Sequence, residues 1–129
     1  MKAQDSQKTI LVIDDEPDIL AFLTTLLEDN GYIVMTAQNG REGTDAMQTQ
    51  MPDLISLDIS MPEKTGVKFY RELKSDPKLS KIPVVMVTGV ADVFEDFISS
   101  RKQVPPPEGY IHKPIKESTY LAKIKELLA

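Results

Sequence analysis

The sequence contains no cysteine and no tryptophan, and it lacks long apolar runs. Without cysteine the chain can form neither a disulfide nor a thiolate metal site, which fits a reducing compartment. Runs such as Ile10–Ile13 and Val84–Val87 are four residues long, whereas a membrane-spanning helix needs about 20 apolar residues. These absences favour a soluble, cytoplasmic protein without a membrane span.

Positive charge is also in deficit. The 129 residues include 15 lysines and arginines against 20 aspartates and glutamates, so the net charge is −5. Because nucleic acids and anionic lipids are repelled by such a balance, we expect no direct binding to either. The first residues are polar and lack the apolar stretch of a secretory signal. We predict a polar tail at residues 1–7 and a single domain over residues 8–129.

Short apolar runs alternate with amphipathic stretches along the whole chain. The runs predict strands at Thr9–Ile13, Tyr32–Ala37, Leu54–Leu57, Ile82–Val87 and Tyr110–Ile111. The amphipathic stretches predict a helix that opens at Pro17 and stops at Gly31, and further helices at Arg41–Gln50, Lys64–Lys74, Ala91–Lys102 and Glu117–Leu128. The apolar stripe expected to face inward on the first helix is Ile19, Phe22, Leu23, Leu26 and Leu27.

Five strands that alternate with five helices predict an α/β domain with a parallel sheet covered on both faces. At this size the leading option is a flavodoxin-like, doubly wound five-stranded sheet of order 2-1-3-4-5. Asn39-Gly40 is typical of a turn or helix cap, and Pro105–Pro107 is a stiff segment before the last strand. In such sheets ligands bind at the carboxyl ends of the strands.

Those strand ends carry acids and one lysine. Asp14 and Asp15 follow the first strand, and Asp58 follows the third, its expected neighbour in the sheet. Like charges a few ångströms apart repel by roughly 1–4 kcal/mol per pair, so a site that keeps them usually holds a cation. Oxygen ligands without His or Cys favour Mg²⁺ over Zn²⁺.

Two further strand ends suggest phosphoryl chemistry. Thr88 and Lys113 offer a hydroxyl and an ammonium, which together with Mg²⁺ could hold the three outer oxygens of a phosphoryl group. The chain has no G-x-x-x-x-G-K-[ST] loop to cradle a nucleotide. A carboxylate could therefore itself be the acceptor, since aspartyl phosphates are established intermediates.

With these motifs in order, the sequence resembles a response-regulator receiver domain of two-component phosphorelay systems, of the chemotaxis-regulator type. The resemblance covers about Lys8 to Leu128. The matching residues are Asp14, Asp15, Asp58, Met61-Pro62, Gly66, Thr88-Gly89, Gly109-Tyr110 and Lys113-Pro114.

The resemblance implies a role for each matching acid. Asp58 would be the phosphoacceptor. Asp15 and Asp58 would bind Mg²⁺ directly, together with the backbone carbonyl of Ser60, and Asp14 would act through a water. On this reading the chain is not an enzyme but a signalling domain that catalyses only its own phosphorylation and dephosphorylation.

The resemblance also implies a switch and partners. Thr88 and Lys113 would bind phosphoryl oxygens, and Thr88 and Tyr110 would be the switch residues. The donor would be a phosphohistidine on a sensor histidine kinase or histidine phosphotransfer protein. The output partner would bind the surface formed by the predicted helix Ala91–Lys102, the last strand and the last helix, and a homodimer is one option.

Several residues have a purely structural interpretation. Tyr110 is nearly as well explained as a buried aromatic at the edge of the sheet, and His112 is read as structural. Gly66 is read as loop geometry, and Pro114 as a cis proline that orients Lys113. Ser60 and Val90 occupy positions that influence acyl-phosphate hydrolysis in the family, and an apolar Val90 would not orient water, so we hypothesise a moderately long-lived phosphoform.

Three other classes remain as alternatives. A haloacid-dehalogenase-type phosphatase also uses an aspartyl phosphate, but it places an acid where this chain has Ser60. A flavin carrier of the same fold would need a first loop rich in Ser and Thr, whereas this loop is acidic. A pseudo-receiver would usually have lost the acceptor, the acids or the lysine, all of which are present.

Overall fold

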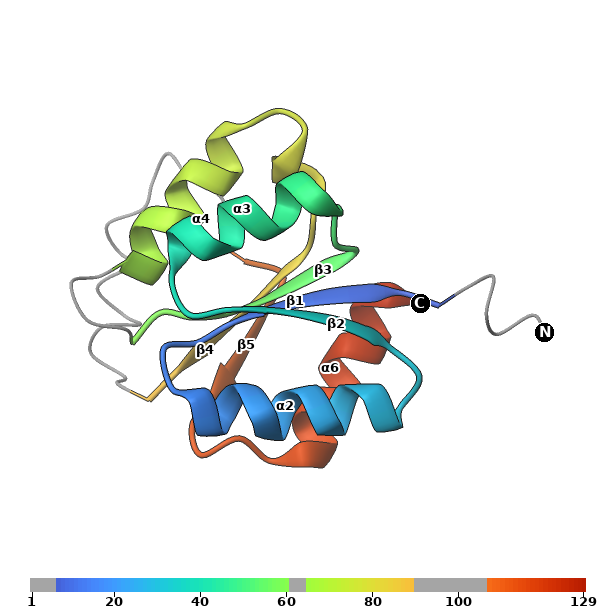
Figure 1. Ribbon diagram of the computed structural model, residues 1–129. Helices are drawn as coiled ribbons and strands as arrows, with labels where there is room; N and C mark the ends of the chain where they lie inside the picture. The colour runs from blue at the N-terminus through green and yellow to red at the C-terminus, as the bar shows by residue number, and fades with distance from the viewer. Residues whose placement is uncertain (1–6, 61–64, 90–106) are drawn as a thin grey trace.

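The computed structural model describes residues 7–60, 65–89 and 107–129. A five-stranded parallel sheet forms the middle layer, with α3 and α4 on one face and α2 and α6 on the other (Figure 1). The strands are β1 Thr9–Ile13, β2 Ile33–Ala37, β3 Leu54–Asp58, β4 Val84–Thr88 and β5 Gly109–His112. The helices are α2 Pro17–Asp29, α3 Gly40–Thr49, α4 Thr65–Ser75 and α6 Glu117–Leu128, with a 3₁₀ turn, η2, at Leu79–Lys81.

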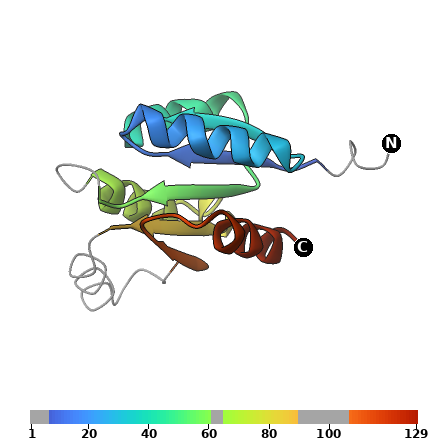
Figure 2. The ribbon, with the colours of Figure 1, turned by 90° about the horizontal axis from the view of Figure 1, so that it is seen from below.

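The strand order is β2-β1-β3-β4-β5, as predicted. All four neighbouring pairs are parallel, and the arrows of β1 and β3 point the same way in Figure 2. Every residue of β1, β3 and β4 is buried. Burial on both faces explains why these strands are apolar runs rather than alternating sequences.

The sheet divides the core into two layers. Alternate residues of a strand point to opposite faces, so Ile10 and Val12 pack on one side and Leu11 and Ile13 on the other. The layer beneath α3 and α4 includes Ile55, Leu57, Met86, Phe69, Tyr70 and Leu73. The layer beneath α2 and α6 includes Leu54, Val85, Val87, Leu23, Leu27, Tyr120 and Ile124.

The first helix begins and stops where the sequence predicts. Pro17 is its first residue, and Gly31 follows its end with a φ of 90°. The N–H of Gly31 donates to the Glu28 carbonyl at 3.0 Å, and the N–H of Tyr32 donates to the Leu27 carbonyl at 3.1 Å. This pair of bonds is a Schellman motif, in which the left-handed position favours glycine.

One predicted core position is wrong. Phe22 is 38% exposed, whereas Leu20, which the predicted stripe omits, is only 8% exposed. Each helical residue turns by about 100°, so Phe22 lies well to one side of Leu23 and away from the face shared by Leu20, Leu23 and Leu27. The inward face of α2 is therefore narrower than the apolar pattern suggests.

Other boundaries differ from the prediction by one or two residues. β3 and β4 extend by one residue to Asp58 and Thr88, and β4 begins at Val84 rather than Ile82. Asn39 caps α3, because its side-chain oxygen accepts the N–H of Glu42 at 2.9 Å. The predicted helix Ala91–Lys102 lies outside the described residues, as do Met61, Pro62, Val90 and Pro105–Pro106. In the part of the chain that the structure describes, no helix is long and apolar enough to cross a membrane.

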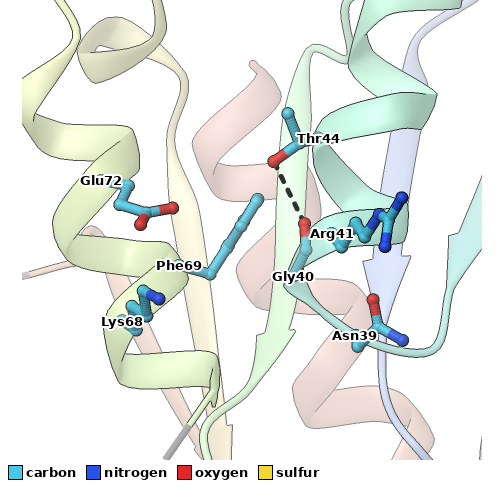
Figure 3. A pocket seen from close by; sticks show the side chains of 7 residues that line it. All are labelled: Asn39, Gly40, Arg41, Thr44, Lys68, Phe69 and Glu72. Atoms are coloured by element: carbon cyan, nitrogen blue, oxygen red, sulfur yellow. Dashed lines mark hydrogen bonds between the residues drawn. The ribbon is translucent and has the colours of Figure 1, made fainter.

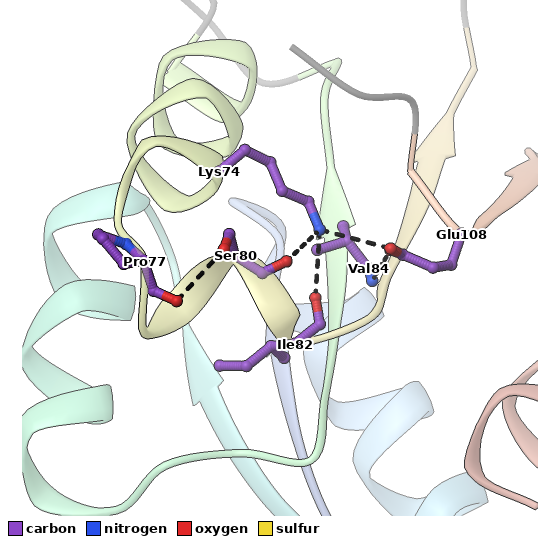
Figure 4. A network of polar contacts seen from close by, with 6 residues as sticks. All are labelled: Lys74, Pro77, Ser80, Ile82, Val84 and Glu108. Carbon is purple, nitrogen blue, oxygen red and sulfur yellow. Dashed lines mark hydrogen bonds and ion pairs between the residues drawn. The ribbon is translucent and has the colours of Figure 1, made fainter.

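A polar network ties three elements together at the amino edge of the sheet (Figure 4). The Lys74 ammonium donates to the Ser80 carbonyl at 3.1 Å and the Ile82 carbonyl at 3.4 Å, and it lies 3.5 Å from a Glu108 carboxylate oxygen. The other Glu108 oxygen accepts the N–H of Val84 at 2.7 Å. These bonds fasten the entry of β5 to α4 and β4.

Candidate functional site

The polar strand ends meet at the carboxyl edge of the sheet. Ile13 pairs with Leu57, so the residues that follow, Asp14 and Asp58, lie side by side at the carboxyl ends of neighbouring strands. Thr88 pairs with His112, which places Lys113 beside the end of β4. The register therefore brings residues from distant parts of the sequence to one location.

Asp58 is the last residue of β3 and only 2% exposed. One carboxylate oxygen, Oδ1, accepts the Ser60 N–H at 2.9 Å and the Ser60 hydroxyl at 2.6 Å. The other, Oδ2, accepts a hydrogen bond from the Lys113 ammonium at 3.1 Å. Both oxygens of this buried carboxylate are thus supplied with donors, as a buried charge requires.

Lys113 is held from several sides. Its backbone N–H donates to the Thr88 carbonyl at 2.8 Å, and the peptide bond to Pro114 is cis, as expected. Its ammonium also lies 3.7 Å from a Glu16 carboxylate oxygen. Burial by itself lowers the pKa of Lys113, but the hydrogen bond that it donates to Asp58 and the nearby negative charges outweigh burial and raise that pKa. The ammonium therefore stays protonated at neutral pH.

Asp14, Asp15 and Glu16 form an acidic cluster, with one carboxylate oxygen from each lying within 4.8 Å of the others. Asp14 is 2% exposed, and its Oδ1 accepts the Glu16 N–H at 2.9 Å. Burial raises the pKa of Asp14 to about 6; the Glu16 N–H and Lys113 oppose this shift, and the charge of Asp58 adds to it. Ionised Asp14 is therefore energetically unfavourable unless a cation balances its charge.

The donor set of this cluster fits a hard divalent cation. All its donors are carboxylate oxygens, two of the three acids are exposed, and Mg²⁺ prefers one or two carboxylates plus waters. The group of mutually close acids includes Glu16 and not Asp58, whose carboxylate is bonded to Ser60 and Lys113. The predicted sharing of a metal between Asp15 and Asp58 stays a prediction.

Thr88 and Tyr110, the predicted switch residues, occupy neighbouring strands. Thr88 ends β4 and is fully buried. Tyr110 lies on β5 opposite Met86, is half-buried, and packs against the core layer beneath α3 and α4. Burial raises the pKa of the Tyr110 phenol. His112 is exposed at the end of the same strand.

The structure adds two contacts that the sequence did not reveal. The Glu16 carboxylate reaches Lys113, and the Ser60 hydroxyl reaches Asp58. Gly66, interpreted above as loop geometry, lies in α4 instead. It must be glycine there because a Cβ would lie 2.5 Å from the Asp58 carbonyl oxygen and 2.9 Å from Ile59 Cα. The only sequence signal for the first two was their closeness to Asp15 and Asp58.

The fold and the site together define the class of protein: a flavodoxin-like α/β domain with acids and a lysine at the carboxyl edge of its sheet. The family model of the response regulator receiver domain matches residues 10–125. The chain belongs to this family. It is the receiver domain of a phosphorelay response regulator, a signalling component of two-component systems.

Individual relatives agree with this assignment. Protein PilH of Pseudomonas aeruginosa is 36% identical over 120 residues, which cover 93% of this chain and 97% of PilH. The polar-differentiation response regulator DivK of Brucella anthropi is 32% identical over 121 residues, covering 94% and 96%. The solved signal receiver domain of a histidine kinase from Syntrophus aciditrophicus is 33% identical with a TM-score of 0.82, covering 94% of this chain and 89% of that one.

Proposed function

We propose that Asp58 accepts a phosphoryl group from a phosphohistidine on a sensor histidine kinase or histidine phosphotransfer protein. One observation carries the proposal: the Asp58 carboxylate is 2% exposed, yet Lys113 binds it at 3.1 Å beside the acidic cluster. A fixed positive charge beside a buried carboxylate can stabilise the negative charge that a phosphoryl group brings to that carboxylate during transfer. The unit that acts is the single domain at residues 8–129, preceded by a polar tail at residues 1–7.

The reaction is a direct phosphoryl transfer. An Asp58 oxygen forms a bond to phosphorus while the bond from phosphorus to the imidazole nitrogen breaks. The imidazole leaves with the electron pair and takes up a proton. Lys113 would neutralise the transferred oxygens, and Thr88 would donate its hydroxyl to one of them.

The acids would hold Mg²⁺, with Asp15, Asp58 and the Ser60 carbonyl as direct ligands and Asp14 acting through a water. When bound, the ion supplies positive charge to the phosphoryl oxygens. The raised pKa of Asp14 supports this assignment, because a cation would relieve the cost of keeping that buried acid ionised.

Phosphorylation would shift the domain between two states. Thr88 would move toward the phosphoryl group, and Tyr110 would turn into the space behind it. The surface formed by the predicted helix Ala91–Lys102, β5 and α6 would then bind an output partner differently. The Ser60 hydroxyl and the apolar Val90 would leave a moderately long-lived phosphoform.

A mass measurement tests the acceptor. The protein is treated with a small phosphodonor and Mg²⁺ and then weighed intact. We expect a gain of one phosphoryl group that is absent from Asp58→Asn and absent without the metal. A gain of the same size in Asp58→Asn would place the modification elsewhere, and no gain in the wild type would refute the proposal.

A further inference from the structure

A second site lies between α3 and α4, where a pocket of 460 Å³ opens (Figure 3). None of the proposed phosphotransfer residues lines it. Its lining residues are Asn39, Gly40, Arg41 and Thr44 on the α3 side and Lys68, Phe69 and Glu72 on α4. In Figure 3 the Phe69 ring stands between the two helices, and the charged side chains flank it. Since α3 and α4 cover the sheet face opposite α6, the pocket is separate from the part of the predicted output surface that α6 forms.

The floor of the pocket is fixed by close packing. A Cβ on Gly40 would lie 3.2 Å from Phe69 Cβ, and a Cβ on Gly43 would lie 3.3 Å from Phe69 Cε1. Phe69 itself is 4% exposed. Gly40 and Gly43, one helical turn apart, therefore leave room for the Phe69 ring between the helices. This packed ring forms the floor of the pocket, and the polar side chains surround it.

The walls carry more positive than negative charge. Arg41 and Lys68 are two cations against the single carboxylate of Glu72. Among the residues that the structure describes, neither cation forms an ion pair, although Lys68 and Glu72 are four residues apart on one helix. The positive end of the α3 dipole adds to this local field at Gly40. The pocket is thus locally positive, although the net charge of the chain is −5.

We propose that this pocket docks an acidic segment of a partner protein, with a carboxylate held between Arg41 and Lys68. A basic segment would meet two like charges there. An extended polyanion, such as a nucleic acid or an anionic membrane, would meet the exposed Asp45 and Glu42 on the same helix. A short acidic segment places its charge in the pocket without covering these acids.

The docking site is independent of the proposed phosphoacceptor chemistry. Its lining contains neither Asp58 nor any residue bonded to it. Asp58→Asn is therefore expected to bind the acidic segment as the wild type does, so that failure of one proposal leaves the other standing.

Nuclear magnetic resonance on the full chain tests the pocket. Hexaglutamate is titrated into the ¹⁵N-labelled protein, with hexaglutamine and hexalysine as matched peptides. We expect saturable shifts at Gly40, Gly43 and Thr44 with hexaglutamate alone. Arg41→Glu and Lys68→Glu should each weaken binding by roughly threefold to tenfold, and Glu72→Gln should strengthen it by about twofold.

Arg71→Glu is the matched control, because it reverses one charge on α4 at an exposed position that does not line the pocket. Its affinity should stay within about twofold of the wild type, since exposed charges outside a contact contribute little. Absence of saturable shifts, shifts centred on Lys113 and Lys116, or equal weakening by Arg71→Glu would overturn the proposal. Shifts of the same residues with phosphatidylserine vesicles but not with hexaglutamate would instead assign the surface to a membrane and also overturn it.

Discussion

At the scale of single residues, the site depends on buried carboxylates that have different partners. Asp58 is bonded to Lys113 and Ser60, whereas Asp14 has one backbone donor and lies near another acid. The two acids are equally buried, at 2% exposure, so burial alone does not distinguish them. Asp58 is paired with a positive charge, whereas ionised Asp14 has no such partner in direct contact among the described residues and destabilises the fold.

Asp14→Asn should raise thermal stability in metal-free buffer. The folded pKa of Asp14 is about 6 and its ordinary value is 3.8, so the folded state binds the proton more tightly than the unfolded state. The stability linked to this group is present at low pH and is lost as the pH rises from about 4 to about 6. Asparagine keeps an oxygen for the Glu16 N–H and carries no charge.

We therefore expect Asp14→Asn to melt several degrees higher than the wild type at pH 7.5 and equally at pH 4, since 1 kcal/mol is worth about 4 °C in a domain of this size. Mg²⁺ should raise the melting temperature of the wild type more than that of the variant. Calorimetry checks this, with the exposed Asp45→Asn as control. A lower melting temperature at pH 7.5 would mean that Asp14 is a structural cap.

Lys113→Met should slow phosphorylation by a small phosphodonor by about 10²-fold, because it removes a fixed positive charge beside the acceptor. The variant also leaves Asp58 without its ion pair, so its stability should fall as well. Exposed Lys125→Met is the control. A variant that folds and is phosphorylated at the wild-type rate would contradict the assigned role.

At the scale of elements, glycines fix where helices begin and end, each for a different reason. Gly31 ends α2 in the left-handed region, and nothing lies within 4 Å of the Cβ it lacks. Gly66, the second residue of α4, lies against the backbone of Asp58, where there is no room for a side chain. The first reason is conformational and the second is steric.

The two glycines should respond differently to alanine. Gly31→Ala should cost roughly 1–2 kcal/mol of stability through backbone strain, with the phosphorylation rate unchanged. Gly66→Ala should cost about 1–3 kcal/mol and also slow phosphorylation, because the displaced backbone carries Asp58. Denaturant unfolding and the mass measurement check both variants. Equal phosphorylation rates in the two variants would show that α4 does not position the acceptor.

At the scale of the whole molecule, β5 is held at both ends, by the proposed phosphoryl site and by the polar network at the amino edge of the sheet. Lys113 follows β5 and contacts Asp58, while Glu108 precedes it and binds Lys74 and Val84. Tyr110 lies between these anchors, half-buried on an edge strand. A shift at Lys113 therefore reaches Tyr110 within one short strand.

Tyr110→Ala should uncouple phosphorylation from the change in the proposed output surface, which includes β5 and α6. In the wild type we expect phosphorylation to change the hydrogen exchange of β5 and α6. The variant should still gain the phosphoryl group but lose most of that change, whereas Tyr32→Ala, on the far edge of the sheet, should keep it. A full response in Tyr110→Ala would leave Tyr110 as a core aromatic only.

Sequence patterns predicted the strands, the described helices and the strand-end residues because each is a local property. Apolar runs such as Thr9–Ile13 need burial wherever they lie, and Pro17 and Gly31 mark helix ends through their own backbone preferences. Neighbouring acids at Asp14 and Asp15 are visible in the chain itself. The resemblance to receiver domains supplied their roles.

Other features depended on distances that no local pattern contains. Tyr120 donates to Ser56 at 2.7 Å inside the core, which satisfies two polar groups 64 residues apart. Phe22 lies outside the apolar face although its spacing fits, because the packing of α2 against the sheet selects Leu20 instead. The reach of Glu16 to Lys113 likewise requires β1 and β5 to end at the same edge.

By itself, then, the sequence determined the α/β class, the strand order as the leading option, and the acids and lysine that characterise the family. The tertiary structure decided which of these groups touch. In the folded chain Lys113 binds Asp58, and Glu16 lies in the acidic cluster with Asp14 and Asp15. The packing of α3 and α4 also leaves a basic pocket between them. The reason is physical: burial and backbone preference act on each residue where it stands, whereas electrostatic pairing depends on distances that only the packed sheet sets.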